Sequence, residues 1–527
     1  MKFLSALKTT ATLTALSLVA APALAQDVTL ESLDGSIRLK GELMEFDGER
    51  YRLKSGIGEM IIDAFQVTCE GAACPAPELL QTEITISGSR TLATALMPAL
   101  IEGFSIGLDA DVIMATGENQ STMMSLTDSD GGQVADVVLA KGGSSSGLRQ
   151  LAANEASLAL TTRPARPPEL QAVASAGFGD ISRSGFENIL ALDGLLVVTS
   201  PNNPVRAISE ADMARVFSGR ITNWTQLGGP DAQINLYVRS NDSGTGSVFN
   251  QLVMQPAQSR MSPNARVLDS DADVSDAVAS DPFGIGFTSF SNERNAKALA
   301  IRGVCGIQTP ANAFTIKTEE YPLTRRLYLY RPDKALPPLT DRFLEFLRSE
   351  EAQGIIADTG FVDQAVSSIS INNQGLRFVS AVLPSDAETS YPQLQAMMRD
   401  LITADRSTIT FRFEQGSARL DSRAEADVRR LAEMLASGDF DGKEVLLIGF
   451  TDSVGLGDLN LSLSQARAEQ VRQALVSAAP PGALADSQIR VAGYGEMSPL
   501  GCNETLNGRR INRRVEVWSR DLVGARG

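Results

Sequence analysis

The spacing of apolar and polar residues changes along the chain, and each change marks a new segment. Residues 27–68 alternate apolar and polar side chains, as around Ile37 and Leu39, with Asp34-Gly35 between two of the runs. A period of two predicts β-strands, and Asp-Gly pairs favour tight turns between them. We therefore expect a small β-rich module over residues 26–78. No residue pattern in it indicates a particular chemistry, so packing or docking is its default role.

A mixed α/β pattern begins at Glu83. Strand-like runs end in turns rich in Ser, Thr and Gly, and each turn opens a segment with apolar residues at helical spacing; the turns lie at 87–92, 142–147 and 242–247. The first N–H groups of a helix lack partners within the helix, and the positive end of its dipole lies with them. One such turn is more often a capped helix after a polar loop. Three in one α/β region predict an oxyanion site.

An arginine precedes the third turn. Arg239 follows the apolar positions Leu236 and Val238 of a predicted strand and lies four residues before Ser243. Its guanidinium is a planar, two-pronged donor that suits an oxyanion. Arg239 is therefore the predicted charged ligand of this site.

The C-terminal part of the chain has its own alternation of elements. Residues 408–413 read as a strand, and Ser422 with Glu425 has the spacing of a capping box for the next helix. The later strands and helix are predicted at 445–449, 462–476, 489–492 and 514–518. The order β-α-β-α-β-β predicts a small α+β sandwich. The preceding residues 364–405 are predicted to be a linker that contains a short helix.

Two charged residues of this sandwich suggest a binding function. Asp452 ends the apolar strand, and Arg467 lies on the following helix at the border of its apolar face. A carboxylate and a guanidinium at one crevice suit a zwitterion that carries both an amine and a carboxylate. The alternative is a direct Asp452–Arg467 pair that stabilises the loop.

Composition excludes several functions. The 527-residue chain has a formal charge of −16 and no histidine. The charge argues against nucleic acid as a partner. Without histidine the usual zinc ligand and the commonest general base are missing, so we expect no metal, no cofactor and no enzymatic activity. The acidic run 269–273 lacks the Gly and Glu of a calcium loop and is interpreted as a solvated loop.

The N-terminus indicates export. Residues 1–25 combine two lysines, an apolar run and Ala23-Leu24-Ala25, which is typical of a secretory signal peptide. No later apolar run is long enough to span a membrane. In an oxidising compartment Cys69 and Cys74 are expected to form a local disulfide. The spacing leaves open whether Cys305 and Cys502 pair across domains or stay free.

Several segments resemble the phosphate-binding protein of phosphate ABC transporters. They include ALDGLLVVTSPNNPV (191–205), ITNWTQLGG (221–229) and VRSNDSGTGSVF (238–249), and also 282–290 and 343–362. The likeness covers residues 83–363. It implies an α/β, two-lobed periplasmic binding protein of type II, whose lobes close over their ligand.

The resemblance also implies a set of anion ligands. They are Thr91 and Leu92 in the first turn, Ser144 in the second, and Arg239, Ser243, Gly244 and Thr245 around the third. Where phosphate-selective members have an aspartate, this chain has Thr162, followed by Arg163. Arg163 is equally compatible with ligand contact and with a hinge or surface position. The missing carboxylate predicts weaker rejection of sulfate, unless Asp193 or Asp242 replaces it.

The C-terminal sandwich resembles the OmpA-like domain that binds peptidoglycan. The matching segments are GFTDSVGLGDLNLSLSQARAEQV (449–471), GYGEMSPLGCN (493–503) and GRRINRRVEV (508–517), within residues 406–520. In that family the matching aspartate and arginine hold the diaminopimelate of the stem peptide, and they fall on Asp452 and Arg467. Phe450 stands where many members have histidine, and Arg513 or Arg514 is interpreted as a structural or supporting residue without a firm role.

Together the two resemblances imply a periplasmic receptor for phosphate or a related oxyanion, anchored to peptidoglycan near the outer membrane. An ABC transporter permease is the further partner that such a receptor implies. A wall-bound receptor does not diffuse freely to the inner membrane. The alternative is therefore an envelope structural or sensor protein whose binding domain no longer feeds a transporter.

Overall fold

The structure is a computed structural model of the chain. It describes residues 27–32, 37–46, 50–64, 67–71, 73–74, 82–370, 391–413, 420–484 and 488–522. The chain divides into two compact units, one up to Gln81 and one from Thr82 onward. The expected signal peptide over residues 1–25 lies outside the described residues. No helix of the described part is both long and apolar enough to cross a membrane.

The first unit is a five-stranded antiparallel sheet in the order β4-β3-β2-β1-β5. Its strands are β1 (Asp27–Ser32), β2 (Arg38–Phe46), β3 (Arg50–Ser55), β4 (Gly58–Asp63) and β5 (Val67–Glu70). Alternate residues such as Val28, Leu30 and Leu53 are buried, as a period of two requires. The predicted β-rich module is therefore present, and the predicted Cys69–Cys74 disulfide closes its end with an S–S distance of 2.02 Å.

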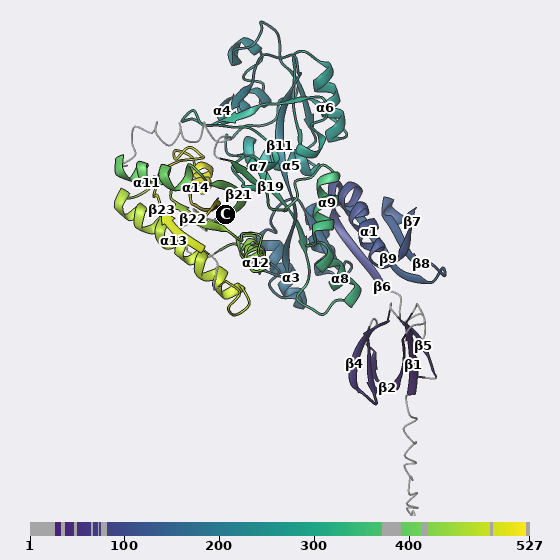
Figure 1. Ribbon diagram of the computed structural model, residues 1–527. Helices are drawn as coiled ribbons and strands as arrows, with labels where there is room; N and C mark the ends of the chain where they lie inside the picture. Colours follow the sequence, from purple (N-terminus) through teal and green to yellow (C-terminus); the bar gives the residue numbers. More distant parts are fainter. Residues whose placement is uncertain are drawn as a thin grey trace, which may run out of the picture. The chain divides into compact units, whose positions relative to one another are not determined.

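The second unit begins with a lobe built on one end of a long mixed sheet, which we call the first lobe (Figure 1). Its strands are β6 (Thr82–Ser89), β7 (Ala110–Thr116), β8 (Thr122–Asp128), β9 (Gln133–Gly142) and β10 (Leu158–Thr161). Its helices are α1 (Met97–Ile106), α2 (Ser144–Ala152), α3 (Pro167–Val173), α8 (Pro338–Phe346) and α9 (Glu350–Asp358). Strands β9, β6 and β10 run parallel, so their carboxyl ends meet at one edge.

The second lobe carries the other end of the sheet, in the order β14-β13-β15-β11. Its elements are β12 (Ala207–Ser209), α4 (Glu210–Phe217), β13 (Asn235–Arg239), α5 (Gly244–Phe249), β14 (Arg266–Leu268), α6 (Asp271–Ser280), β15 (Gly284–Ser289), β16 (Lys297–Ala298), β17 (Ala300–Arg302), β18 (Gln308–Thr309) and α7 (Ala313–Lys317). Stacked and edge-on phenylalanines, Phe217, Phe249 and Phe287, lie in its apolar core.

Two long strands connect the lobes. The first half of β11 (Glu187–Thr199) pairs with β19 (Thr324–Tyr330), and its second half pairs with β15. Because β11 and β19 are shared by both parts of the sheet, we call them the hinge strands. This is the two-lobed α/β arrangement that the resemblance implied.

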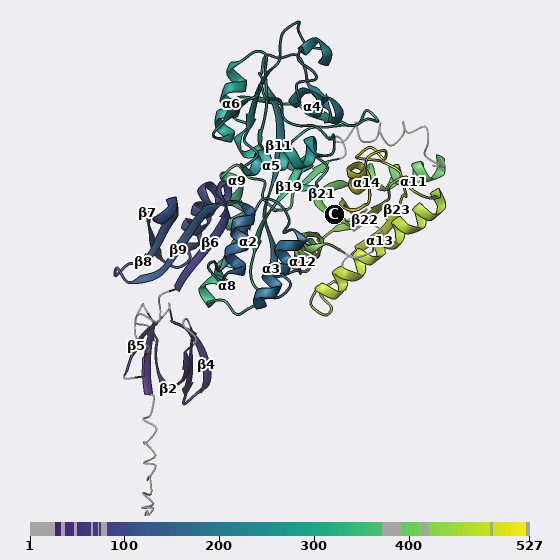
Figure 2. The same cartoon turned by 180° about the vertical axis from the view of Figure 1, so that it is seen from behind.

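The C-terminal part is a five-stranded sheet in the order β20-β21-β24-β22-β23. Figure 2 shows its strands β21, β22 and β23 near α13 and α14. Its elements are β20 (Ser368–Ser370), α11 (Tyr391–Leu401), β21 (Asp405–Arg412), α12 (Ser422–Ser437), β22 (Lys443–Phe450), α13 (Gly457–Ala478), β23 (Gln488–Gly493), α14 (Leu506–Asn512) and β24 (Arg514–Asp521). The expected α+β sandwich is present. It has one strand and two helices beyond the predicted order: β20 and α11 fall in the predicted linker, and α14 is short and polar and gives no apolar period.

Both faces of this sheet are covered. Val445 and Leu447 of β22 pack beneath α12 and α13, whereas Leu446 and Ile448 pack with Met397 and Leu401 of α11. The latter residues fall in the segment 364–405 that was predicted to be a linker. Helix α11 and the strand β20 therefore belong to the sandwich, while residues 371–390 lie outside the described residues.

The predicted capping box of α12 is wrong by one position. The helix begins at Ser422, and the preceding Asp421 is its N-cap, whose side chain accepts a hydrogen bond from the Ala424 N–H. A carboxylate one residue earlier reaches the same backbone donors and also opposes the helix dipole. The Ser422 hydroxyl is thereby left to bond elsewhere.

Candidate functional sites

The first site lies where three parallel strands of the first lobe end. Ser89 of β6 pairs with Gly142 of β9, and Leu160 of β10 pairs with Gly88. The turns that follow these strands therefore leave the sheet at one edge. The carboxyl edge of a parallel sheet is where α/β proteins place ligands.

Each turn presents residues that the sequence had suggested. Ser144 is the first residue of α2, and its hydroxyl accepts a hydrogen bond of 3.1 Å from the Thr162 N–H. Leu92 is fully buried at the start of the short helix Leu92–Leu96, which packs against β9 and β10, and Thr91 is the residue before it. Thr91, Leu92, Ser144 and Thr162 are thus neighbours.

The third turn lies opposite, on the second lobe. Ser243 is the N-cap of α5, and its hydroxyl accepts a hydrogen bond of 2.9 Å from the Gly246 N–H. A Cβ atom at Gly244 would lie 3.5 Å from the Thr162 hydroxyl oxygen of the first lobe. The two lobes therefore meet at this point, and the start of α5 faces the edge where the three strands end. Thr162 is 3% exposed, so little solvent reaches it in this closed arrangement.

The guanidinium of Arg239 is held in place by residues of its own lobe. Its Nε donates a 3.0 Å hydrogen bond to Asp271 Oδ1, and its Nη1 donates to the Leu268 carbonyl. Asp271 also accepts from the Thr245 hydroxyl at 2.8 Å. The guanidinium is thus oriented by a carboxylate that neutralises part of its charge, and Thr245 supports the same carboxylate.

Arg163 has a different set of partners. Its Nη1 and Nη2 donate to the two oxygens of Glu169 at 2.8 and 2.7 Å, and Nη2 also donates to the Ser145 hydroxyl at 2.7 Å. Burial alone would raise the pKa of Glu169, but these bonds and the Arg166 N–H lower it to about 2. Arg163 therefore joins the start of α2 to the start of α3, and so positions the second turn.

Two carboxylates had been considered as replacements for the aspartate missing at position 162. Asp193 is fully buried and accepts from Arg325 Nε at 2.9 Å and from the Phe290 N–H at 3.1 Å. Burial raises the pKa of Asp193 despite Arg325. Asp242 is exposed in the loop before α5. The Asp193 carboxylate is thus paired with Arg325 of the hinge strand β19. Asp242 lies in the third turn and is the remaining candidate to replace the missing aspartate.

The second site lies in the C-terminal sandwich, at the end of β22. Asp452 Oδ2 accepts a 2.6 Å bond from Arg513 Nη1, and Asp452 Oδ1 accepts from the Val454 N–H. Arg467 lies on α13, 4% exposed, with its guanidinium carbon 5.2 Å from the centre of the Phe413 ring. Its Nε and Nη1 are buried and have no hydrogen-bond partner within the part of the chain that the structure describes.

This environment fits a carboxylate ligand. Burial, and then the nearby Arg513, lowers the pKa of Arg467, because two guanidiniums share one carboxylate. Buried donors without partners are costly. A ligand carboxylate at Arg467 would satisfy them and balance the second positive charge. The aspartate of the sequence-suggested pair is thus bonded to Arg513, and Arg467 keeps donors available.

Comparison with known proteins places both parts of the chain. Residues 78–351 match the model of the PBP superfamily domain, which is 274 of the 527 residues. The chain belongs to the PBP superfamily. Residues 412–513 match the OmpA family, so the binding-protein domain is followed by an OmpA domain.

Individual relatives agree with this division. The phosphate-binding protein PstS of Bacillus subtilis is 28% identical over 230 residues, which cover 43% of this chain and 71% of the relative. PstS of Borreliella burgdorferi is 26% identical over 188 residues, covering 35% of this chain and 67% of the relative. Outer membrane porin F of Pseudomonas fluorescens is 36% identical over 112 residues, 21% of this chain and 32% of the relative.

The binding-protein domain contains one site residue that sequence reasoning missed. Asp271 lies in the acidic run 269–273, which was interpreted as a solvated loop, and that interpretation is wrong. Ser270 caps α6 here, and Asp271 is 9% exposed and bonded to Arg239. The available signal was Ser270 three residues before Asp273, which is the spacing of a helix start.

In the OmpA domain, sequence reasoning assigned Arg513 no specific partner. It holds Asp452 at the end of β22 although 61 residues separate them. The sequence signal was its position immediately before β24, which is the neighbour of β22 in the sheet.

Proposed function

We propose that this chain is an exported, non-catalytic receptor for phosphate or a closely related oxyanion, attached non-covalently to peptidoglycan. The observation that carries the first half is the convergence of four turn residues of the first lobe with the start of α5 and Arg239. Phosphate is the named ligand of the PstS relatives. In our proposal the ligands are Thr91, Leu92, Ser144, Thr162, Arg239, Ser243, Gly244 and Thr245, with Arg163 and Asp271 as positioning residues.

The chemistry follows from the groups at hand. Backbone N–H groups and hydroxyls at helix starts donate hydrogen bonds to oxyanion oxygens, and Arg239 supplies positive charge. A local site of this kind is needed because the overall charge of −16 repels anions. All of these groups act as hydrogen-bond donors or as positive charge toward an anion, so the proposed role is capture.

Calorimetric titration of the full chain with phosphate tests this half. Arg239→Ala should weaken binding by about 2 kcal/mol, roughly thirty-fold, because it removes a charge-assisted contact. Arg239→Lys should recover only part of the loss. Arg266→Ala, on the neighbouring strand β14 and exposed, is the matched control and should bind normally. Equal affinity of Arg239→Ala and wild type would place the anion elsewhere.

The second half rests on Arg467 and its two buried donors without partners. We propose that the ligand is the diaminopimelate of the stem peptide, with its carboxylate on Arg467 and its ammonium on Asp452. Charge complementarity supports this assignment, because a zwitterion satisfies both groups at once.

Co-sedimentation with purified diaminopimelate-containing peptidoglycan tests it. Arg467→Ala and Asp452→Ala should each abolish pelleting, with unchanged circular dichroism. Arg472→Ala, on the same helix with a 41% exposed side chain, should pellet normally. Pelleting of Arg467→Ala like wild type would contradict the proposal, and loss of fold would favour a structural role.

One observation favours a sensor or storage role over feeding a transporter. The disulfide Cys305–Cys502 fixes the second lobe on the OmpA domain, so the receptor cannot extend away from a wall-bound OmpA domain on a linker alone. Uptake of labelled phosphate by cells expressing wild type or Arg239→Ala distinguishes the two. If the chain feeds a transporter, cells with wild type should take up more phosphate than cells with Arg239→Ala. If it is a sensor or a reservoir, uptake should be equal in the two.

A further inference from the structure

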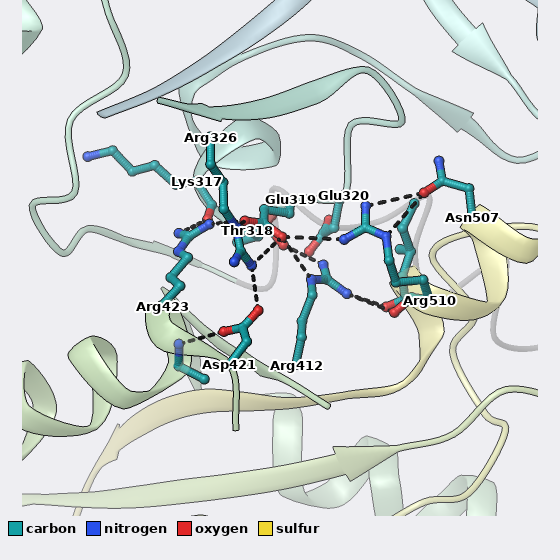
Figure 3. A network of polar contacts seen from close by, with 12 residues as sticks. Lys317, Thr318, Glu319, Glu320, Arg326, Arg412, Asp421, Arg423, Asn507 and Arg510 are labelled. Carbon is teal, nitrogen blue, oxygen red and sulfur yellow. Dashed lines mark hydrogen bonds and ion pairs between the residues drawn. The ribbon is translucent and has the colours of Figure 1, made fainter. Parts of the chain in front are cut away.

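Glu319 is a carboxylate at which the OmpA domain packs against the binding-protein domain, as Figure 3 shows. Glu319 follows α7 at the end of the second lobe and is 4% exposed. Arg326 of the hinge strand β19 forms an ion pair with Glu319. Three arginines of the OmpA domain approach it: Arg423 at 2.7 Å, Arg510 at 3.5 Å and Arg412 at 3.7 Å.

The backbone at Glu319 has a conformation that is uncommon for a glutamate. Its φ is +53°, in the left-handed region that helix ends usually fill with glycine. A glutamate there costs conformational energy that glycine would avoid. The cost is offset because its side chain is the common acceptor for arginines from both domains.

The OmpA domain is also bonded covalently to the second lobe. Cys305, in the turn between β17 and β18, forms a disulfide with Cys502, with Cα atoms 5.5 Å apart. Beside Glu319, Glu320 pairs with the buried Arg406 of β21. Covalent and ionic contacts therefore hold the OmpA domain on the second-lobe side of the hinge.

A second group of contacts reaches the first-lobe side. Asp421 accepts a 2.8 Å bond from Arg326, and the Ser422 hydroxyl donates to Glu187, the first residue of β11. Glu187 in turn accepts from the Tyr330 hydroxyl at 2.7 Å, and that hydroxyl accepts from the Ala165 N–H at 3.0 Å. The start of α12 is thus connected, through the ends of both hinge strands, to the loop that follows Thr162.

We propose that the OmpA domain is a brace across the hinge of the binding-protein domain. Opening of the lobes moves the first-lobe end of the hinge away from the second lobe. Because the disulfide keeps the OmpA domain on the second lobe, opening has to break the contact between Ser422 and Glu187. The brace therefore stabilises the closed arrangement in which Gly244 faces Thr162, and this inference does not depend on which anion binds.

The first experiment tests whether the docking survives without covalent linkage. A protease site is inserted after Gln374, the full chain is cleaved, and the disulfide is reduced. The two fragments should still co-elute in size-exclusion chromatography at low salt. The β20–β21 pairing and the Glu320–Arg406 ion pair are kept in all variants. Glu319→Gln should separate the fragments at a lower salt concentration than wild type, because three OmpA arginines lose their shared anion, while the exposed control Glu345→Gln should behave like wild type. Separation of the wild-type fragments at low salt, or separation of the Glu319→Gln fragments only at the salt concentration that separates wild type, would overturn the brace.

The second experiment tests the connection to the first lobe. Hydrogen exchange of the intact chain is followed at the Ala165 N–H and along β19. Ser422→Ala should raise exchange at Ala165 about five-fold, the equivalent of one lost hydrogen bond. Ser437→Ala, at the other end of α12, is the matched control. Unchanged exchange in Ser422→Ala would show that the brace does not reach the first lobe, and neither readout requires anion binding.

Discussion

At the scale of single residues, we expect Thr162 to determine which anions the proposed site distinguishes. Thr162 lies between Ser144 of its own lobe and Gly244 of the other. A carboxylate at this position would repel an anion that has no proton to share, whereas a hydroxyl both donates and accepts. The side chain at position 162 therefore has direct access to whatever the lobes enclose.

We predict that wild type discriminates weakly between phosphate and sulfate and that Thr162→Asp sharpens the discrimination, chiefly by penalising sulfate. Competition between the two anions is measured at a pH where phosphate carries one proton. Asp242→Asn serves as the control for the nearby exposed carboxylate. Exclusion of sulfate by several orders of magnitude in wild type would contradict the prediction and make Asp242 the next candidate.

Residue-level reasoning predicted the features of the proposed site that follow from local order and failed for those that depend on distant pairing. The turn residues and Arg239 were predictable because strands that end in Ser/Thr/Gly turns place helix starts at one edge. The Arg239–Asp271 pair was not, since 32 residues separate its members and only the fold adjoins them. The same holds for Arg513, which sits across the sheet from the strand that Asp452 ends.

At the scale of elements, the start of α12 shows how one residue shifts a local prediction. Ser422 with Glu425 satisfied the capping-box spacing, yet Asp421 supplies the cap and Ser422 bonds Glu187. Most other elements followed from their periods, as in the α+β order of the C-terminal sandwich. The exceptions are α14, which lacks a period, and α11, whose apolar side packs on a sheet face that the local pattern does not reveal.

We predict that Asp421→Ala destabilises the OmpA domain by about 1 kcal/mol or more, because it removes the N-cap of α12 and a partner of Arg326. Ser422→Ala should leave the stability of α12 nearly unchanged, since its hydroxyl does not cap the helix. Thermal unfolding of the full chain, followed through the OmpA transition, measures both. Equal losses in the two variants would restore Ser422 as the cap.

At the scale of the whole molecule, the order of the domains along the chain was predictable, whereas the packing of the OmpA domain on the binding-protein domain was not. Two unrelated patterns, a two-lobed α/β domain and an α+β sandwich, predicted a receptor and an anchor joined by a linker. The structure instead buries Glu319 among arginines that lie 93 to 191 residues away along the chain, apart from Arg326. Such charges have no local periodicity, so the sequence does not indicate which arginines pair with Glu319. The pairs are visible only in the structure, where the two domains are packed together.

The charge of Glu319 makes the docking sensitive to acid. Burial alone would raise the pKa of the Glu319 carboxyl, but Arg326, Arg423 and Arg510 hold it well below its usual value. When the OmpA domain undocks, Glu319 loses Arg423 and Arg510, so its pKa moves back toward its usual value. The stabilisation of the docked state is thus fully present above about pH 4.5 and is lost as the pH falls below that value.

We therefore predict that the docking of the cleaved and reduced chain is constant between pH 7 and about pH 5 and is lost progressively as the pH falls below about 4.5, because protonation removes the shared anion of the arginines. Sedimentation velocity at each pH measures the fraction of docked fragments, and circular dichroism of each sample checks that both domains stay folded. Glu319→Gln already lacks the titrating group, so its weaker docking should vary much less over the same range. If wild type and Glu319→Gln showed the same pH dependence, Glu319 would not be the group that holds the domains together.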